Sequence, residues 1–220
     1  VVNPLPESVN ETSGLIFWDN LFWTHNDNSD INLYALDTIY GKVTRKYPLL
    51  GISNTDWEEI SQDEDYIYVG DFGNNSGNRT DLKVYMISKK GIADNTHIYD
   101  SICFSYPEQT DFDAGSYDSD FDCEAFIVSG DSLYLFTKGW ASNQTTLYSV
   151  PKTPGTWNAK RRASLDVNGL ITGAVYDKNK RIIVLTGYSR KLKPFLYLLY
   201  DFTGTGFFGG NKRKIELMMP

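Results

Sequence analysis

The chain of 220 residues contains few cysteines and few histidines, two of each. Two cysteines, Cys103 and Cys123, exclude a scaffold held together by several disulfides and a zinc site built from several thiolates. They could pair with each other in an oxidising compartment, although the strand pattern described below puts them on opposite sides of a sheet. No apolar run approaches the roughly 20 residues that a membrane-spanning helix needs, so we expect no transmembrane segment.

Basic clusters are also scarce, and the formal net charge is −7. The short stretches KRRA and NKRK are the main groups of Lys and Arg. Because affinity for nucleic acids comes largely from neutralising phosphates, we expect no nucleic-acid partner. The motifs of common hydrolases and nucleotide-binding proteins, G-x-S-x-G, H-E-x-x-H and a Gly-rich phosphate loop, do not occur in the sequence. An acidic surface that attracts cations fits this composition.

Aromatic residues are abundant, at 15% of the chain, and they occur in short strand-like runs. A pattern repeats along the sequence, and its units begin at Glu11, Glu58, Glu124 and Thr172. The spacing is 47, 66 and 48 residues, and the long interval contains the acidic stretch EQTDFDAGSYDSDFD. Self-similarity at such a period indicates a repeat architecture.

Each unit contains a short apolar strand, a turn, a strong second strand, a polar loop, a third strand and a weaker outer strand. The second strands are expected at 21–26, 66–72, 133–139 and 181–188, and the third strands at 32–37, 82–88, 145–151 and 194–201. Outer strands are expected at 96–106 and 212–217. Four antiparallel strands per unit predict an all-β fold, a β-propeller with four-stranded blades. The alternative is a β-sandwich whose spacing is coincidental.

We interpret residues 1–220 as one propeller domain with about four blades. The complete protein is expected to have five or six, because the last unit ends without another Glu-led strand. The first residues, VVNPLPES, could provide the outer strand of a final blade. They do not begin with Met, which suggests processing or a removed signal peptide.

In a propeller, the loop that enters the first strand and the loop after the second strand open on the same face. The repeated carboxylates Glu11, Glu58 and Glu124 should therefore surround one channel mouth. We expect these further residues at the same mouth: His25, Asn26, Asp27, Asp71, Asn74, Asn75, Arg79, Lys138 and Tyr188.

Three like charges at one opening must take up protons or recruit a cation. Oxygen ligands from carboxylates and amides suit Ca²⁺, so Glu11, Glu58 and Glu124 are candidate metal ligands. Lys138 could instead neutralise one carboxylate without a metal. Alternatively, each Glu could hydrogen-bond backbone amides of the next blade and hold the ring together.

The candidate bases are His25 and Asp71, and Asn26, Asp27, Asn74, Asn75, Arg79, Lys138 and Tyr188 are candidate ligand-binding residues. Each has a structural alternative. A His in THND is commonly a hydrogen-bonded loop residue, Asp71 and Asn74 could form Asx turns, and Arg79 could form a salt bridge instead of binding an anion.

Three pairs of motifs carry a resemblance to a known group of proteins: ETSGL with WTHNDN, NTDWEEI with YVGDFGNNSGNR, and FDCEAF with LYLFTK. In these motifs the chain resembles a family of uncharacterised secreted β-propellers of Bacteroidetes. More distantly it is similar to gluconolactonase-like and phytase-esterase-like propellers. The family resemblance implies a signal peptide or lipoprotein signal, a secreted, periplasmic or cell-surface location, and a further Glu-led blade. The distant resemblance implies an acidic metal site at the channel mouth.

Three functions follow as hypotheses. The first is a binding propeller whose acidic channel face holds a cation, a small molecule or a glycan, with Trp23, Trp57 and Trp140 as possible stacking surfaces for sugars. The second is a metal-dependent hydrolase of the lactonase or phosphoesterase type, with Ca²⁺ polarising the substrate. The third is a protein-interaction scaffold without chemistry.

Overall fold

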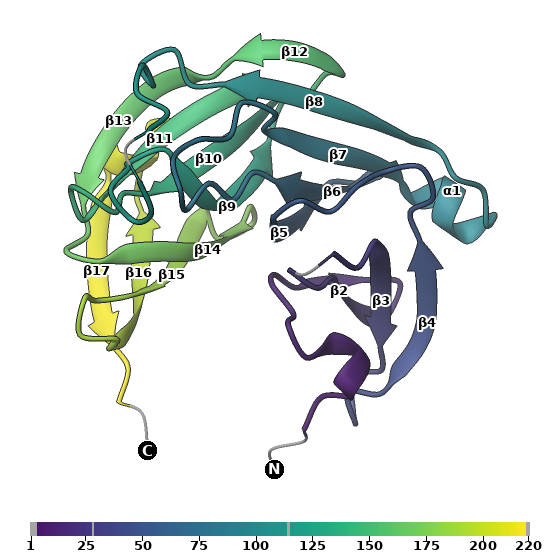
Figure 1. Ribbon diagram of the computed structural model, residues 1–220. Coiled ribbons are helices and arrows are strands. Elements are labelled where there is room, and N and C mark those ends of the chain that lie inside the picture. Colours follow the sequence, from purple (N-terminus) through teal and green to yellow (C-terminus); the bar gives the residue numbers. More distant parts are fainter. Residues whose placement is uncertain (1–3, 28, 114, 219–220) are drawn as a thin grey trace.

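The computed structural model describes residues 4–27, 29–113 and 115–218. Four β-sheets are arranged around a common centre (Figure 1), and the fold is a four-bladed β-propeller. We number the sheets as blades 1 to 4 in chain order. The all-β prediction and the four repeat units are confirmed. The expectation of five or six blades concerns the complete protein and stays a prediction.

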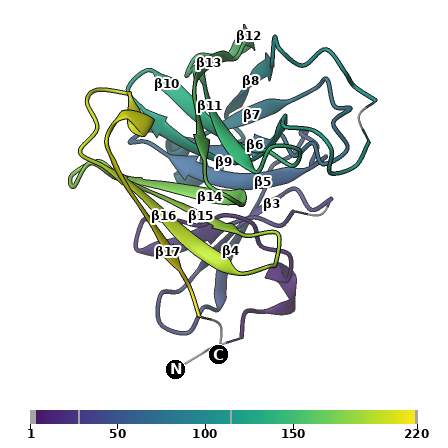
Figure 2. The ribbon, with the colours of Figure 1, turned by 90° about the vertical axis from the view of Figure 1, so that its left-hand side faces the viewer.

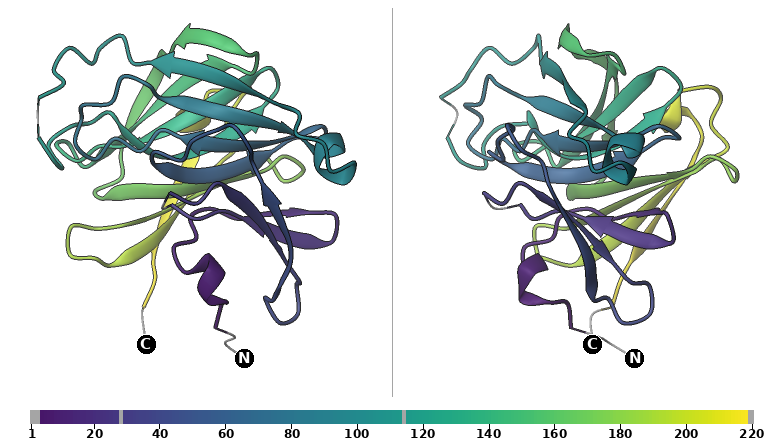
Figure 3. Two further views of the ribbon diagram at one scale, coloured as in Figure 1. Left: turned by 45° about the vertical axis from the view of Figure 1, so that its right-hand side comes forward. Right: turned by 90° about the vertical axis from the view of Figure 1, so that its right-hand side faces the viewer.

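Blades 1 and 2 come from the first half of the chain. Blade 1 consists of β1 (Ile16–Trp18), β2 (Leu21–Thr24), β3 (Asn32–Leu36) and β4 (Val43–Pro48). Blade 2 consists of β5 (Trp57–Gln62), β6 (Tyr66–Asp71), β7 (Lys83–Ser88) and β8 (Tyr99–Ser105), with the short helix α1 (Lys89–Ala93) beside β7 at its outer end (Figure 3).

Blades 3 and 4 come from the second half of the chain. Blade 3 consists of β9 (Asp122–Ser129), β10 (Ser132–Lys138), β11 (Gln144–Pro151) and β13 (Lys160–Asp166). Blade 4 consists of β14 (Leu170–Asp177), β15 (Ile182–Tyr188), β16 (Pro194–Tyr200) and β17 (Asn211–Glu216). The chain also has two short 3₁₀ helices: η1 (Glu7–Val9) packs on blade 1, and η2 (Phe207–Gly209) contacts β13 and β16.

Two details differ from the sequence-based expectation. Blade 2 has a fifth strand, β12 (Gly155–Asn158), which pairs in parallel with β8 and so connects the β11–β13 crossover of blade 3 to its neighbour. The first residues do not form the outer strand of a last blade within the described part of the chain. Instead Val9 packs against Tyr34 and Leu36 of blade 1, and β17 is the outer strand of blade 4.

The core lies between successive blades rather than in the middle of one sheet. Trp23 and Trp57 pack together between blades 1 and 2, and Phe72 meets Phe126 edge to face between blades 2 and 3. A third cluster, which includes Phe195, joins blades 3 and 4. Strands rich in aromatic and β-branched residues pack well on both faces of a pleated sheet, which is what a blade with two neighbours requires.

Local backbone chemistry sets the strand connections. Asp19 and Asn20 both have positive φ, at 52° and 60°, in the two-residue turn between β1 and β2. Such a turn matches the twist of a hairpin, and Asn and Asp tolerate its left-handed conformation better than other side chains do. The turn predicted between the first and second strands of a unit is therefore confirmed in blade 1.

The inner strands β5, β9 and β14 pack side by side near the centre (Figure 2). Glu59 links two of them, because its fully buried carboxylate accepts hydrogen bonds from Ile60 N (2.9 Å) and from Ala174 N of β14 (3.0 Å). Cys103 on β8 and Cys123 on β9 belong to different blades and are both free thiols.

Candidate functional site

The inner strands of blades 2, 3 and 4 each contain a β-bulge at the same point. The pairing with the second strand shifts by one residue there in β5, β9 and β14. The extra residues are Glu58, Glu124 and Thr172, which are the positions at which the sequence repeat begins. A bulge redirects a side chain out of the regular alternation. All three side chains line one central cavity.

This cavity has a volume of about 630 Å³. Its wall is mainly polar and combines residues of all four blades with the long loop before β9. Besides the three bulge residues, it is lined by Thr12, Ser13, Gly14, Asp27, Asn75, Tyr117, Lys138, Trp140 and Tyr188. Of the residues that the sequence predicted at one channel mouth, the following line this cavity: Asp27, Glu58, Asn75, Glu124, Lys138 and Tyr188.

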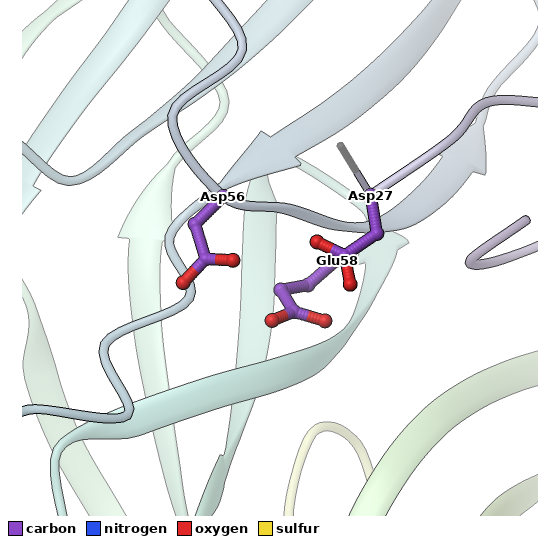
Figure 4. Close-up of side chains that lie close together, drawn as sticks. All are labelled: Asp27, Asp56 and Glu58. Atoms are coloured by element: carbon purple, nitrogen blue, oxygen red, sulfur yellow. The ribbon is translucent and has the colours of Figure 1, made fainter. Parts of the chain in front are cut away.

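Three carboxylates form a cluster at one side of the cavity (Figure 4), and two of them, Asp27 and Glu58, belong to its lining. Asp27 follows β2, Asp56 precedes β5, and Glu58 is the bulge residue of β5. One oxygen from each lies within 4.8 Å of those of the other two. The cluster thus joins blade 1 to blade 2 and presents oxygen atoms that could share one ion.

The electrostatics of this cluster are unfavourable when all three groups are charged. Burial, followed by the charges of Glu124 and Asp56, raises the pKa of Glu58 to about 10. Burial and the neighbouring Asp27 raise the pKa of Asp56 to about 6. Burial and the charge of Glu11 also raise the pKa of Asp27. A bound cation would relieve this repulsion, because it favours the deprotonated form of every carboxyl.

Glu58 is 6% exposed, and its carboxyl makes no hydrogen bond to any residue that the structure describes. Glu58 lines the cavity, so a ligand or ion in the cavity could supply the missing partner. Gly73 keeps space for this arrangement. A Cβ atom at this position would overlap with Asp56 Oδ2 and Glu58 Oε1.

The opposite side of the cavity pairs an acid with a base. Lys138 Nζ forms a buried salt bridge with Glu124 Oε1. Burial raises the pKa of Glu124 to about 7, although Lys138 acts in the opposite direction. The same ammonium group lies 4.5 Å from the ring centre of Trp140 and 5.6 Å from that of Tyr188. Glu124 is therefore compensated within the chain, whereas Glu58 is not.

Aromatic side chains complete this second wall. Trp140 Nε1 donates a hydrogen bond to the buried Asp122 Oδ2 (2.7 Å), which fixes the indole. Tyr117 meets Trp140 edge to face at 4.6 Å and is 57% exposed. Its backbone has φ 65°, and its N–H donates to Asn75 O (2.8 Å). A bulky residue in the left-handed region is uncommon, so this loop holds Tyr117 beside the cavity at some conformational cost.

Glu11 does not join the other two repeat glutamates. It is exposed, it precedes β1 by several residues, and it does not line the cavity. The equivalent part of blade 1 is near Gly14, between the Thr12–Asn26 bridge and the Ile16–Trp23 pair. The alignment of Glu11 with Glu58 and Glu124 was wrong because an apparent sequence repeat does not reveal where a bulge shifts the register.

His25, a predicted base, is fully buried away from the cavity lining. Its Nδ1 lies 3.2 Å from Asn26 O, and its ring packs against Trp57 at 5.7 Å. Burial lowers the pKa of His25 to about 4, so the ring is neutral at pH 7. The geometry gives it a packing position between blades 1 and 2.

Asp71, the other predicted base, is also buried and outside the lining. Its Oδ1 accepts hydrogen bonds from Asp56 N (3.1 Å) and from Arg79 Nη2 (2.9 Å), so Arg79 is bound to a protein carboxylate rather than free for an anion. Asn74 supports the same loop, since its N–H donates to Asp122 Oδ1 (2.7 Å).

Asn26 likewise faces the protein, because its side-chain amide donates to Ser8 O (2.9 Å) and to Asp30 Oδ2 (3.1 Å). Of the three tryptophans considered for sugar stacking, Trp23 and Trp57 are fully buried and Trp140 lines the cavity.

The residues expected at the channel mouth from the sequence include neither Asp56 nor Tyr117. Asp56 lies two residues before Glu58, a spacing that places both carboxylates at one strand entry. Tyr117 lies in the acidic insertion between the second and third units, and an aromatic residue in such a polar loop was the available signal. Its position over the cavity depends on the folding of the loop.

Comparison with protein-family models finds no match for this chain, and no curated protein matches it. Among solved structures, a Bacteroides fragilis protein described as exported is 11% identical to this chain, with a TM-score of 0.47. The match covers 97% of this chain and 74% of that one. A Bacteroides uniformis protein described as a 6-phosphogluconolactonase is 12% identical to this chain, with a TM-score of 0.43. The match covers 98% of this chain and 57% of that one.

The WD40 repeats of RRP9 are 10% identical with a TM-score of 0.43, and the chain covers half of that structure. At such identities and TM-scores, these likenesses say nothing about chemistry. The resemblance to a secreted Bacteroidetes family is matched by no family model and stays a prediction. Among the described residues, no helix is long and apolar enough to cross a membrane.

Proposed function

We propose that this propeller binds a divalent cation, Ca²⁺, through Asp27, Asp56 and Glu58, and that the loaded cavity binds a small polar ligand or a glycan. One observation carries the proposal. Three carboxylate oxygens from two blades converge within 4.8 Å, and no salt bridge neutralises any of the three side chains within the described residues.

The choice of cation follows from the ligands. All three donors are hard oxygens, which favour Ca²⁺ or Mg²⁺ over softer metals. Ca²⁺ binds oxygens at about 2.3–2.6 Å, so two ligands on opposite sides of the ion are about 4.6–5.2 Å apart. The cluster has this scale. Ca²⁺ also takes 6–8 ligands, so three carboxylates leave coordination positions for water or for ligand oxygens from the cavity.

Calorimetry tests the cation site directly. Chelator-stripped protein is titrated with Ca²⁺, beside the variants Glu58→Gln and Asp56→Asn and the matched control Glu64→Gln, which alters an exposed acid of blade 2. Wild type and the control should bind one ion, and the two cluster variants should bind at least roughly tenfold more weakly. Equal binding by all four proteins would place the ion elsewhere. Absence of binding in the wild type would reject the cation site and favour an interaction scaffold.

A metal-dependent hydrolase is the second candidate, and Glu124 is the observation that favours it. This carboxyl lines the same cavity as the cluster, and its pKa of about 7 suits a general base near neutral pH. His25 and Asp71 do not face the cavity, which removes the bases considered from the sequence. Hydrolysis of glucono-δ-lactone or p-nitrophenyl phosphate by the Ca²⁺-loaded protein, lost in Glu124→Gln, would establish this function. Absence of turnover with intact Ca²⁺ binding would leave the binding function.

A further inference from the structure

We infer that the ligand of the central cavity is an uncharged saccharide, held by a pair of neighbouring hydroxyl groups on the bound cation and by Tyr117 at the rim. This inference rests on the proposed cation site and deepens it. It concerns the charge of the ligand, which the repeat pattern did not address.

The first argument is the charge of the loaded cavity. Asp27, Glu58 and Glu124 are the carboxylates of its lining, Asp56 lies beside the first two, and Lys138 is the ammonium group of the lining. One divalent ion and Lys138 together do not fully neutralise four carboxylates. The guanidinium of Arg190 lies 5.4 Å from the ring centre of Trp140. If its positive charge is counted too, the net charge of the loaded cavity becomes zero but not positive.

An anionic ligand therefore gains no net attraction from this site. Lys138 does not change this conclusion, because Glu124 already binds its ammonium group. Arg190 is also engaged, since its Nε donates to Asn143 Oδ1 (2.6 Å). Phosphate esters and sugar acids would have to displace these contacts, whereas a neutral ligand would not.

The second argument is the chemistry of the remaining wall. Thr172 and Tyr188 offer hydroxyl groups to the cavity, and Asn75 offers an amide. Thr12 and Ser13 line it too, but their hydroxyl groups are bonded to Thr24 Oγ1 and to Glu58 O. Hydroxyl and amide groups both donate and accept hydrogen bonds, which matches the hydroxyl groups of a sugar. Neighbouring sugar hydroxyls can also occupy the coordination positions that three carboxylates leave open on Ca²⁺.

The third argument is the exposed aromatic ring at the rim. Tyr117 is 57% exposed, although Trp140 supports its ring and a hydrogen bond to Asn75 fixes its backbone. A rigid aromatic ring with an exposed surface can bury the apolar C–H face of a sugar at little entropic cost. The cavity volume of about 630 Å³ lies within the range typical of small-ligand sites.

The test uses saturation-transfer NMR on the Ca²⁺-loaded protein with named probes. Neutral probes are the methyl glycosides of glucose, galactose, mannose and fucose, and the charged probes are glucuronate and inorganic phosphate. At least one neutral glycoside should bind, and addition of EDTA should abolish its signal. Tyr117→Ala should weaken that binding by roughly tenfold without changing Ca²⁺ affinity. Tyr40→Ala, a matched change of a 61% exposed tyrosine outside the cavity, should have no effect.

Three outcomes would overturn the inference: binding of glucuronate or phosphate alone, binding of no probe, and sugar binding that persists in EDTA. The Ca²⁺ titration separates the two proposals. If wild-type protein binds no Ca²⁺, the cation site itself fails. If it binds Ca²⁺ but no neutral glycoside, the cation site stands and the ligand assignment fails.

Discussion

Glu58 and Glu124 are the extra residues of equivalent β-bulges in neighbouring blades, but only Glu124 has a basic partner. Lys138 neutralises Glu124, whereas Glu58 faces Asp27 and Asp56. The same repeated position thus serves two purposes. In blade 3 the carboxyl is part of a buried ion pair, and in blade 2 it is available to a ligand from outside the chain.

The stability of the metal-free protein should fall as pH rises. Folding raises the pKa of Asp56 to about 6, of Glu124 to about 7 and of Glu58 to about 10. The folded protein therefore holds protons that the unfolded chain releases above about pH 4–5, and stability is lost as pH rises through these folded-state values. Thermal unfolding after chelator treatment should show a higher Tm at pH 5 than at pH 8.

Two further observations check this pH dependence. Groups with lowered pKa values act in the opposite sense. Burial lowers the pKa of His25 to about 4, so this residue favours folding as pH rises from about 4 to 6.5, whereas Asp63 and Asp81 act only below about pH 4. The raised pKa values of the carboxyls outweigh His25 between pH 5 and pH 8. Added Ca²⁺ should raise Tm more at pH 8 than at pH 5, because it must displace protons at the lower pH. A Tm that increases from pH 5 to pH 8 without metal would contradict the electrostatic account of the cluster.

Glu58→Gln should make the metal-free protein more stable at pH 8 while abolishing Ca²⁺ binding. At pH 8 the folded protein holds Glu58 protonated although the ordinary pKa of the group is about 4.5, and this costs stability. The amide removes that cost, and it removes a metal ligand at the same time. Glu59→Gln is the matched comparison. Burial raises the pKa of Glu59 as well, to about 8, but the two oxygens of this carboxyl each accept a backbone hydrogen bond and Gln keeps only one of these acceptors. Glu59→Gln should therefore gain less stability at pH 8 than Glu58→Gln, and it should leave Ca²⁺ affinity unchanged. Urea denaturation and calorimetry measure both effects, and the opposite ranking would refute the assignment.

Gly73→Ala should weaken Ca²⁺ binding by roughly tenfold or more. The added methyl group would occupy the space of Asp56 Oδ2 and Glu58 Oε1 and force the two carboxylates apart. Gly209→Ala is the control, since a Cβ atom there meets no other atom within 4 Å. If both variants bind Ca²⁺ like the wild type, the carboxylates do not need the space at Gly73.

Lys138→Met should destabilise the protein by roughly 3 kcal/mol at pH 8, because it leaves Glu124 buried and unpaired. The loss should be smaller at pH 5, where Glu124 takes up a proton. The double variant Glu124→Gln/Lys138→Met should recover part of the stability at pH 8. Urea denaturation at both pH values measures this, and an equal loss at pH 5 and pH 8 would indicate that packing on Trp140, rather than charge, is what Lys138 contributes.

The strands themselves could be predicted from the chain because their signals are local. The second strands, the third strands and the turn at Asp19 and Asn20 each depend on neighbouring residues. All of them lie where the sequence pattern predicts. The crossover strand β12 could not be predicted in this way. Its pairing with β8 joins residues about fifty positions apart, and GTWN has no strong strand signal.

The sequence by itself determined the repeat, its strand order and the two acids Glu58 and Glu124 that begin successive units, since periodicity is a property of the chain. Tertiary structure alone decided which acids meet. Glu11 fits the spacing of the repeat but lies outside the cavity, whereas Asp27 and Asp56 come together across two blades. The physical reason is that a bulge shifts the register by one residue, and packing between blades then determines which side chains become buried near one another. Neither effect leaves a periodic trace in the sequence.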